Sequence, residues 1–280
     1  MFGDNAYASD IVRAAVDAIA RNGAKLKPKH IRKTGRDIIQ QNSNIQYLLE
    51  TRPNIYMDAY TFYYRVLTEL FMRNNSFIFI DKDAAGTPIG LYPISSANLE
   101  LLESKNEIYA RFKFYGGEQV TIPYTNIVHL RRFFYDNDFY GASNKALMPT
   151  LELINTTNQG IANAIKTSAN MRGILKFTKA MLKPEDIKKE RDRFVTEYMN
   201  IDNTGGIGAI DAKAEFIPLD SKPQIVDKDT MAHIKQSVYD YFGVSEPIIT
   251  SNYTEEQWNA FYESTLAPVA VQMGLEFTAK

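Results

Sequence analysis

Two helical patterns joined by a short polar loop constrain the fold of this chain more than any other feature. The patterns span about 226–242 and 254–276, and the first stops at Pro247, which cannot continue a helix. Thr254 followed three residues later by Gln257 resembles a capping box, which starts a helix. The segment contains no obvious catalytic group. It is typical of a structural component that places a loop between two helices.

Composition and length exclude several classes of protein. With 280 residues, 45% of them hydrophobic, the chain can form one large domain or two small ones. Its net charge of −1 gives no global signal for tight nucleic-acid binding. The absence of cysteine excludes a disulfide scaffold, thiolate metal sites and Cys nucleophiles. There is no apolar run of about 18 residues, so we expect no membrane span, and the N-terminus is not a secretion signal.

The first quarter of the sequence predicts three helices. An amphipathic helix begins at Ser9 or Asp10 and ends at Gly23, and a short helix is expected around Asp37–Glu50. A strong helix is expected over 55–73, because aromatic and aliphatic residues recur there at three- and four-residue steps. We interpret this stripe as core packing rather than as a base-stacking platform; it comprises Tyr56, Tyr60, Tyr63, Leu67, Leu70 and Phe71.

The pattern then changes to short strands separated by turn residues. Alternating apolar residues over 107–114 indicate a strand with one buried face and one solvent-exposed face. We expect a single antiparallel sheet packed against the preceding helix. Its strands are predicted at Ser76–Ile80, Ile89–Ile94, Asn98–Leu102, Glu107–Phe114, Gln119–Ile122 and Asn126–Leu130.

An aromatic, acidic loop at 133–143 precedes a long helix at about 145–170. The apolar stripe of that helix is narrow, which suits either packing between like neighbours in an oligomer or an ordinary half-buried helix. The stripe comprises Leu147, Leu151, Ile154, Asn158, Ile161 and Ile165. A small α/β unit is expected next, from strand Gly173–Thr178, helix Pro184–Met199, loop Asn200–Gly208, and strands Ile207–Asp211 and Ala214–Leu219.

No pattern of catalytic or metal-binding residues emerges. The three histidines, His30, His129 and His233, lack ligand spacing, and His129 lies in an apolar strand, where a satisfied core histidine is expected. The sequence contains neither a P-loop nor a GxSxG motif. We therefore expect no catalytic residue, no cofactor and no metal.

The order of these pieces resembles the HK97-like family of tailed-bacteriophage portal proteins. The resemblance runs from about residue 9 to the end and is carried by SDIVRAAVDAIARNGAKL, LTELFMRNNSFIFIDKDAAGTPIGLYPI, IPYTNIVHLRRF with GAS at 141–143, EYMNIDNTGGIGAID, and YFGVSEPII with NYTEEQWNAFYESTLAPV. Three departures stand out. Asn144 replaces a usual proline, residues 168–171 replace a glycine-containing turn, and the family's final crown segment is absent.

The resemblance implies an α+β, multi-part portal fold. Residues 1–135 would form an α/β wing, 136–170 and 221–244 two stem helices, and 171–220 a small α/β clip. Residues 245–280 would form the tunnel loop and a helix leading to a truncated crown. About twelve copies would form a ring-shaped channel at the capsid vertex of the virion, assembled in the bacterial host cytoplasm.

The resemblance also implies site residues and partners. DNA-facing positions would be Asn252, Tyr253, Glu255, Glu256, Lys145 and Lys166. The motor-docking positions of the clip would be Glu185, Lys188, Lys189 and Arg191, although the residues alone favour a salt-bridged solvent face over a docking surface. Partners would be the terminase large subunit, the head–tail adaptor, the major capsid or scaffolding protein, and double-stranded DNA. Trp258 is expected to be a packing anchor rather than a DNA contact.

Charge supports the channel interpretation, because residues 246–263 contain four glutamates and no Lys or Arg. Two alternatives stay open. One is another ring-forming head or secretion component, through which no DNA passes. The other is a metal-dependent nucleic-acid-processing enzyme that uses scattered carboxylates, which DNA cleavage together with stabilisation by a metal would favour.

Overall fold

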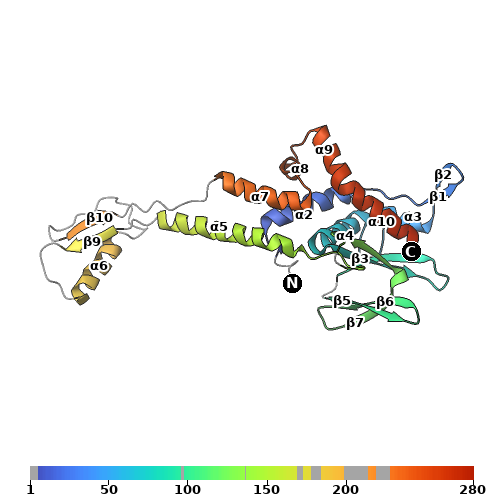
Figure 1. Cartoon of the computed structure of the whole chain (residues 1–280), viewed down its shortest axis with the longest axis horizontal. Coiled ribbons are helices and arrows are strands. Elements are labelled where there is room, and N and C mark those ends of the chain that lie inside the picture. Colours follow the sequence, from blue (N-terminus) through green and yellow to red (C-terminus); the bar gives the residue numbers. More distant parts are fainter. Residues whose placement is uncertain are drawn as a thin grey trace. The chain divides into compact units, whose positions relative to one another are not determined.

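A computed structural model describes residues 6–95, 98–135, 137–168, 173–177, 184–198, 214–218 and 228–280 (Figure 1). The chain divides into two compact units. The first comprises residues 1–151 and 233–280, and the second comprises residues 152–232. Helices and antiparallel strands together give the α+β class that the sequence predicts.

Helix α2 (Asp10–Gly23) lies in the core of the first unit. Its apolar face is buried, and it packs against α4 (Ala59–Arg73). Glycine allows the close approach of the two helices, because a Cβ at Gly23 would displace the end of the Leu67 side chain. Both predicted helices are confirmed. The predicted stripe on α4 is wrong at its N-terminal end, since Tyr56 is 77% and Tyr60 is 47% exposed.

The segment between these helices departs from the prediction. Residues 31–40 form a hairpin of β1 (Ile31–Thr34) and β2 (Asp37–Gln40), and only α3 (Asn44–Glu50) is helical. Gly35 takes a positive φ of 64° in the turn, a conformation that glycine adopts without strain. All residues of both strands are exposed, so the hydrophobic alternation that identifies a half-buried strand is missing.

The six predicted strands are present, but they form two sheets instead of one. β3 (Asn75–Lys82) lies between β4 (Pro88–Ile94) and β8 (Ile127–Arg131) and packs against α4. The second sheet has the order β5-β6-β7, from Asn98–Ser104, Glu107–Lys113 and Gln119–Pro123. A core between the sheets includes Phe77 of β3 and Phe112 of β6, whose rings meet edge to face at 5.5 Å.

Asn144 joins three elements of the first unit. It lies in a short 3-10 turn (Asn144–Leu147), and its amide group donates to the carbonyls of Phe71 and Met72 at the end of α4. Its Oδ1 accepts from Asn74 Nδ2 at 2.6 Å and from the Tyr241 hydroxyl at 2.7 Å. Proline, usual here in the resembling family, has no polar side chain. Asn144 in place of proline therefore supplies four side-chain hydrogen bonds to a buried junction.

In the second unit the described residues form helices and one strand pair. Helix α5 (Met148–Ser168) crosses from the first unit into the second. β9 (Gly173–Phe177) pairs antiparallel with β10 (Ala214–Pro218), and α6 (Pro184–Tyr198) begins at the predicted proline. The predicted loop Asn200–Gly208 and strand Ile207–Asp211 lie outside the described residues.

The stripe predicted for the helix at about 145–170 is right at Leu147 and Ile154, which are buried, and wrong at Asn158 and Ile165. Ile154, Thr157 and Ala164 are buried, whereas Asn158 is exposed and Ile165 is 63% exposed. The predicted positions mixed two neighbouring faces, because steps of three and four can follow either edge of a helix face. Among the described residues, the helices that follow the second unit's strands are α7 (Lys228–Phe242), α8 (Glu246–Thr250), α9 (Glu255–Phe261), a π-helical segment (Tyr262–Leu266) and α10 (Ala267–Ala279).

Candidate functional site: an acidic loop between two helices

The candidate site is the exposed loop between α8 and α9, and its base is tightly held. Helix α7 ends at Phe242, and Gly243 follows with φ of 73°. Val244 and Ile248 are buried. Thr265 Oγ1 donates to the carbonyl of Gly243 at 2.7 Å, which fixes the turn that leads into α8.

Pro247 does not act as the helix stop that the sequence predicts. Glycine ends α7 four residues earlier, and Pro247 occupies the first turn of α8, where its missing N–H costs nothing. At the other end of α8, Ser251 takes a left-handed φ of 61°. Arg21 of α2 donates from Nη2 to the carbonyl of Ile249 at 3.1 Å. The loop therefore leaves the body of the first unit at a capped helix end.

The start of α9 confirms the predicted capping box. Thr254 Oγ1 accepts from the backbone N–H of Gln257 at 3.3 Å, and Gln257 Oε1 accepts from the backbone N–H of Thr254 at 2.9 Å. These reciprocal bonds satisfy two donors that the first turn of a helix leaves free. They fix the direction in which the loop enters α9.

Four predicted DNA-facing residues lie together on this loop and in the first turn of α9. Asn252, Tyr253, Glu255 and Glu256 are all exposed. Hydrogen bonds from its own backbone N–H and from Thr254 lower the pKa of Glu256. Both carboxylates also lie at the N-terminus of a helix, where the helix dipole favours negative charge. The loop thus presents a negatively charged tip at neutral pH.

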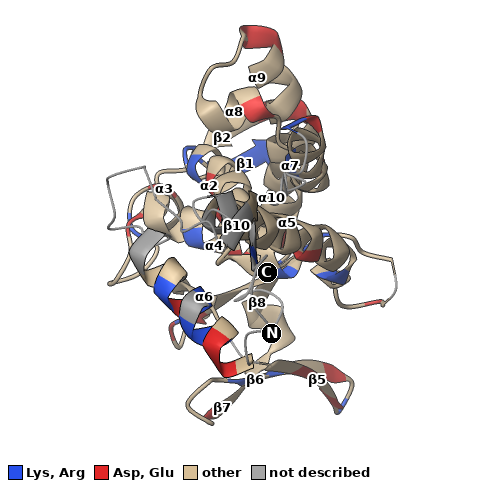
Figure 2. Cartoon of the chain, turned by 90° about the vertical axis from the view of Figure 1, so that its left-hand side faces the viewer, with Lys and Arg blue, Asp and Glu red and all other residues tan. Residues whose placement is uncertain are grey.

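Charge along the chain on either side of the loop has one sign, and the cation at its base, Arg21, comes from α2. No Lys or Arg occurs from residue 236 to residue 279, a stretch that contains Asp240 and five glutamates. Figure 2 shows acidic residues and no basic ones on α8 and α9. A tip of this kind repels phosphate and is unsuited to gripping a nucleic acid.

Trp258 lies half-buried beside the loop. Its ring stacks on Tyr253 at a centroid distance of 5.5 Å and an interplanar angle of 28°, and it tilts against Phe261 at 5.8 Å. Phe261 is buried, with 4% of its surface exposed. The indole therefore connects the exposed loop residue to the packed side of α9.

The remaining predicted site residues lie on other elements. Lys145 is exposed on the 3-10 turn before α5, and Lys166 lies in α5, its side chain outside the described ones. Glu185, Lys188, Lys189 and Arg191 are exposed on α6 of the second unit. Arg191 donates to Asp192, its neighbour in sequence. These positions remain predictions as docking or DNA-facing sites.

Sequence reasoning missed two residues that hold the loop, Arg21 and Thr265. Arg21 contacts Ile249 across 228 positions of sequence, and Thr265 reaches back to Gly243 across 22. Contacts of this range leave no local pattern, so only the fold could reveal them. The capping box, by contrast, lies within four consecutive residues and was visible in the sequence.

His129 is the satisfied core histidine that the sequence predicts. It is 1% exposed and lies between the Tyr124 hydroxyl at 2.8 Å and Asn75 Oδ1 at 3.1 Å. Since an amide oxygen can only accept, Nε2 carries the proton and Nδ1 accepts from Tyr124.

Among the described residues, no three His, Asp or Glu side chains form a group that could hold a metal ion. No helix within the described ranges is long and apolar enough to cross a membrane.

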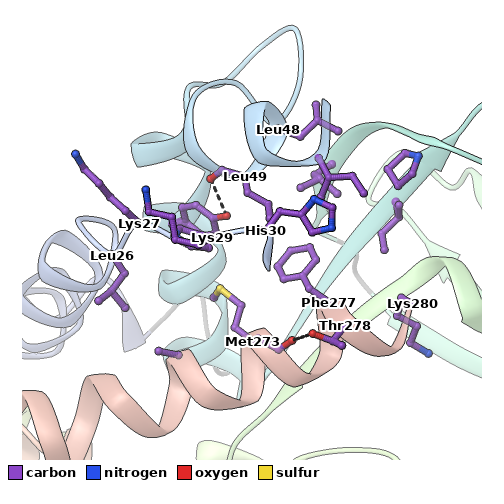
Figure 3. A pocket seen from close by; sticks show the side chains of 18 of the residues that line it. Leu26, Lys27, Lys29, His30, Leu48, Leu49, Met273, Phe277, Thr278 and Lys280 are labelled. Carbon is purple, nitrogen blue, oxygen red and sulfur yellow. Dashed lines mark hydrogen bonds between the residues drawn. The ribbon is translucent and has the colours of Figure 1, made fainter. Parts of the chain in front are cut away.

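A cavity of about 700 Å³ lies beside α10 within the first unit. Figure 3 shows Met273 and Phe277 of α10 on one side and Leu48 and Leu49 of α3 on another. The helix itself has no fully buried residue. Polar contacts hold it, among them those of Gln272, whose side chain accepts from the backbone N–H of Arg131 at 2.8 Å and donates to its carbonyl at 3.0 Å.

Comparisons with known sequences agree with this arrangement. A sequence model of the family described as "Phage portal protein" matches residues 10–280. Two curated proteins, each described as "Probable portal protein" and coming from Lactococcus phage p2 and Lactococcus phage SK1, are 27% identical over 113 residues. The alignment covers 39% of this chain and 30% of each relative, so it spans less than a third of their length.

Solved structures share the fold. The neck of an empty gene transfer agent particle contains a chain with a TM-score of 0.73 and 18% identity, over 97% of this chain and 77% of that one. An HK97 family phage portal protein from Corynebacterium diphtheriae gives a TM-score of 0.60 and 12% identity, over 98% of this chain and 88% of that one. Because the family match covers nearly the whole sequence, the predicted membership is confirmed: the chain belongs to the phage portal protein family.

Proposed function

We propose that this chain is a subunit of a portal ring, a channel at the capsid vertex of a virion through which double-stranded DNA enters and leaves. The family match over residues 10–280 supports a ring-forming head component. One solved neighbour is the neck of a native gene transfer agent particle computed with C12 symmetry, with a TM-score of 0.69, which fits a ring of about twelve copies. The observation that carries the proposal is the exposed acidic loop between α8 and α9.

A channel for moving DNA must confine the duplex without gripping it. Each Lys or Arg that faces a phosphate adds a salt-dependent attraction, which slows sliding. The loop offers Glu255 and Glu256 and no basic residue. Repeated around a ring, these carboxylates repel the DNA backbone and keep the duplex away from the wall. Asn252 and Tyr253 supply brief contacts that do not depend on base sequence.

The subunit itself performs no chemistry in this proposal. The terminase large subunit, which would hydrolyse ATP, docks on the clip (171–220), and the head–tail adaptor later takes its place. The exposed charged side chains of α6 form the docking surface, namely Glu185, Lys188, Lys189 and Arg191. The capsid or scaffolding protein contacts the wing (1–135). Mixed charges of this kind favour fast, salt-sensitive association, as a motor that binds and later leaves requires.

The test reverses the charge of the loop. In the variant Glu255→Lys/Glu256→Lys, rings are expected to form normally, while the amount of DNA packaged into capsids falls at least about tenfold, because each ring gains a circle of phosphate-binding cations. Packaging is measured by nuclease protection, and ring assembly by electron microscopy.

The matched control makes the same charge change elsewhere in the first unit. Glu103 and Glu118 are exposed carboxylates of the β5-β6-β7 region, and Glu103→Lys/Glu118→Lys is expected to package like the wild type. Unchanged packaging in the loop variant would contradict the assignment of this loop to the channel. Equal loss in both variants would show that net charge alone matters.

A further inference from the structure

A chain of polar contacts connects the wing helix α4 to the base of the acidic loop. The Tyr64 hydroxyl of α4 donates to Asp17 Oδ1 of α2 at 2.8 Å. Asp17 Oδ2 pairs with Arg21 Nη1 at 3.5 Å, one turn further along α2. Arg21 Nη2 then donates to the carbonyls of Ile249 at 3.1 Å and Ile248 at 3.4 Å. The network is contained within the first unit.

The carbonyls that Arg21 contacts need an external partner. α8 is a single turn of helix that ends at Thr250, and the last carbonyls of any helix have no partner inside it. Only a long bond, from the Ser251 N–H at 3.4 Å, reaches Ile248 from the chain itself. A guanidinium at a helix C-terminus also interacts favourably with the helix dipole. Arg21 therefore completes an element that is too short to stabilise itself.

Arg21 is well placed to act as a fixed point. It lies in the last turn of α2, which is buried against α4 and also contacts α8. Its planar guanidinium bonds Asp17 with one nitrogen and the α8 carbonyls with the other. A lysine ammonium is a point charge without this fork, so it would not hold both partners in the same geometry.

We propose that Arg21 is a positioning residue for the DNA-facing loop, holding the C-terminal end of α8 so that residues 252–256 project from a fixed base. The inference rests on the proposed function, because it concerns the same loop. Its local part, the clamping of α8, does not need DNA and is measured on the protein alone.

The only tryptophan of the chain reports on the loop. Trp258 stacks on Tyr253, which lies two residues beyond the capped end of α8. If α8 loosens, this stack opens and the half-buried indole becomes more accessible to water. Its emission then shifts to longer wavelength, and acrylamide quenches it more strongly.

The experiment compares Arg21→Ala, Arg21→Lys and a control, Arg13→Ala. Arg13 lies on the same helix, bonds the carbonyl of Tyr7 and covers its ring, and makes no described contact with α8. Arg21→Ala is expected to speed amide hydrogen exchange in residues 246–257 about fivefold and to raise quenching of Trp258, while α4 exchanges as in the wild type. Arg21→Lys is expected to restore part of the protection, and Arg13→Ala to change nothing.

The functional arm measures DNA packaging of Arg21→Ala, expected to fall while rings form normally. Unchanged exchange and quenching in Arg21→Ala would overturn the proposal, as would faster exchange spread equally over α2 and α4. If the loop loosens but packaging is normal, Arg21 does not position a DNA-facing element. If Glu255→Lys/Glu256→Lys also packages normally, the proposed function fails instead, while the clamp on α8 stands.

Discussion

His129 shows how burial and hydrogen bonding set the behaviour of a single residue. Its imidazole is stacked on Phe77 at 4.2 Å and bonded by Tyr124 and Asn75 on either side. Burial, with the charges of Arg131 and Lys280 adding to it, lowers the pKa of His129 from 6.5 to about 3. The ring is therefore neutral in the folded protein throughout the physiological range. This is the behaviour of a packing residue and not of a general base.

A pH dependence of stability follows from that shift. In the unfolded chain, His129 takes up a proton below pH 6.5, whereas in the folded protein it stays neutral down to about pH 3. The unfolded state therefore binds the proton first as the pH falls. The contribution of His129 to the free energy of unfolding therefore has its full value above pH 6.5. Below pH 6.5 this contribution falls by about 1.4 kcal/mol per pH unit, until about pH 3.

Urea unfolding at pH 7.5 and pH 5 measures this contribution. The wild type is expected to lose about 2 kcal/mol more than His129→Gln between the two values, since glutamine keeps polar partners but cannot be protonated. An equal loss in the two proteins would show that His129 does not control the acid sensitivity.

At the scale of elements, α10 has no fully buried side chain and is held largely by polar contacts. It borders the cavity, and Gln272 makes paired hydrogen bonds to the Arg131 backbone. Further along, Glu276 pairs with the Arg131 side chain at 3.9 Å, and Lys280 Nζ donates to the carbonyl of Tyr124 at 3.1 Å. A π-helical segment, Tyr262–Leu266, connects it to α9, and Pro268 sits in its first turn. The wider turn places Leu266 and Thr265 inward, where both are buried. The helix is thus anchored at its buried start and by polar contacts further along.

Two glycines are expected to respond in opposite ways to alanine. A Cβ at Gly274 of α10 meets nothing within 4 Å, so Gly274→Ala is expected to stabilise the protein by about 0.5–1 kcal/mol through helix propensity. A Cβ at Gly141 would lie 2.2 Å from the Arg132 carbonyl oxygen and 2.4 Å from that of Asn74, so Gly141→Ala is expected to cost about 2–3 kcal/mol. The midpoints of urea unfolding of the two variants, compared with the wild type, measure both effects. Destabilisation by Gly274→Ala would mean that the space beside residue 274 is filled.

Elements with a local signal were predictable from the sequence. The capping box of Thr254 and Gln257, the buried face of α2 and the six strands each depend on residues close together in the chain. The hairpin at 31–40 was not predicted, because strands that are exposed on both faces lack the alternation of apolar and polar residues that identifies a strand. Likewise, nothing in the alternation of the strands shows that they divide into two sheets, since that division depends on which edges pair.

Site prediction followed the same division. The family resemblance, supported by charge, pointed to a loop within 245–280, and Asn252, Tyr253, Glu255 and Glu256 are exposed there together. Their role of facing DNA stays a prediction. The supports of this loop were invisible, because Arg21 and Thr265 act over long sequence separations. Asn144 was noted only as a departure from a family pattern. Its role appears when the ends of α4 and α7 are seen to meet at its side chain.

At the scale of the molecule, the residues proposed to face DNA and those proposed to dock partners lie mostly in different units. The first unit contains both three-stranded sheets, the buried helix α2 and the acidic loop, and the second contains the β9–β10 pair and α6 with its exposed charges. Under the proposed function, the larger unit carries the loop that faces DNA and the smaller unit carries the surface on which partners dock. One copy of the chain contributes a single loop, whereas the proposed channel wall needs many such loops around an axis, which a ring of identical copies supplies.

Ring formation tests this account most directly. Mass photometry over a concentration series, followed by electron cryomicroscopy of the large species, measures both the number of copies and the position of the loop. The account predicts closed rings of about twelve copies of the 31.9 kDa chain, with residues 252–256 lining a central hole about wide enough for duplex DNA. Rings with this loop on their outer rim would contradict it. So would a chain that stays at 31.9 kDa at every concentration and cleaves DNA when a divalent metal is added.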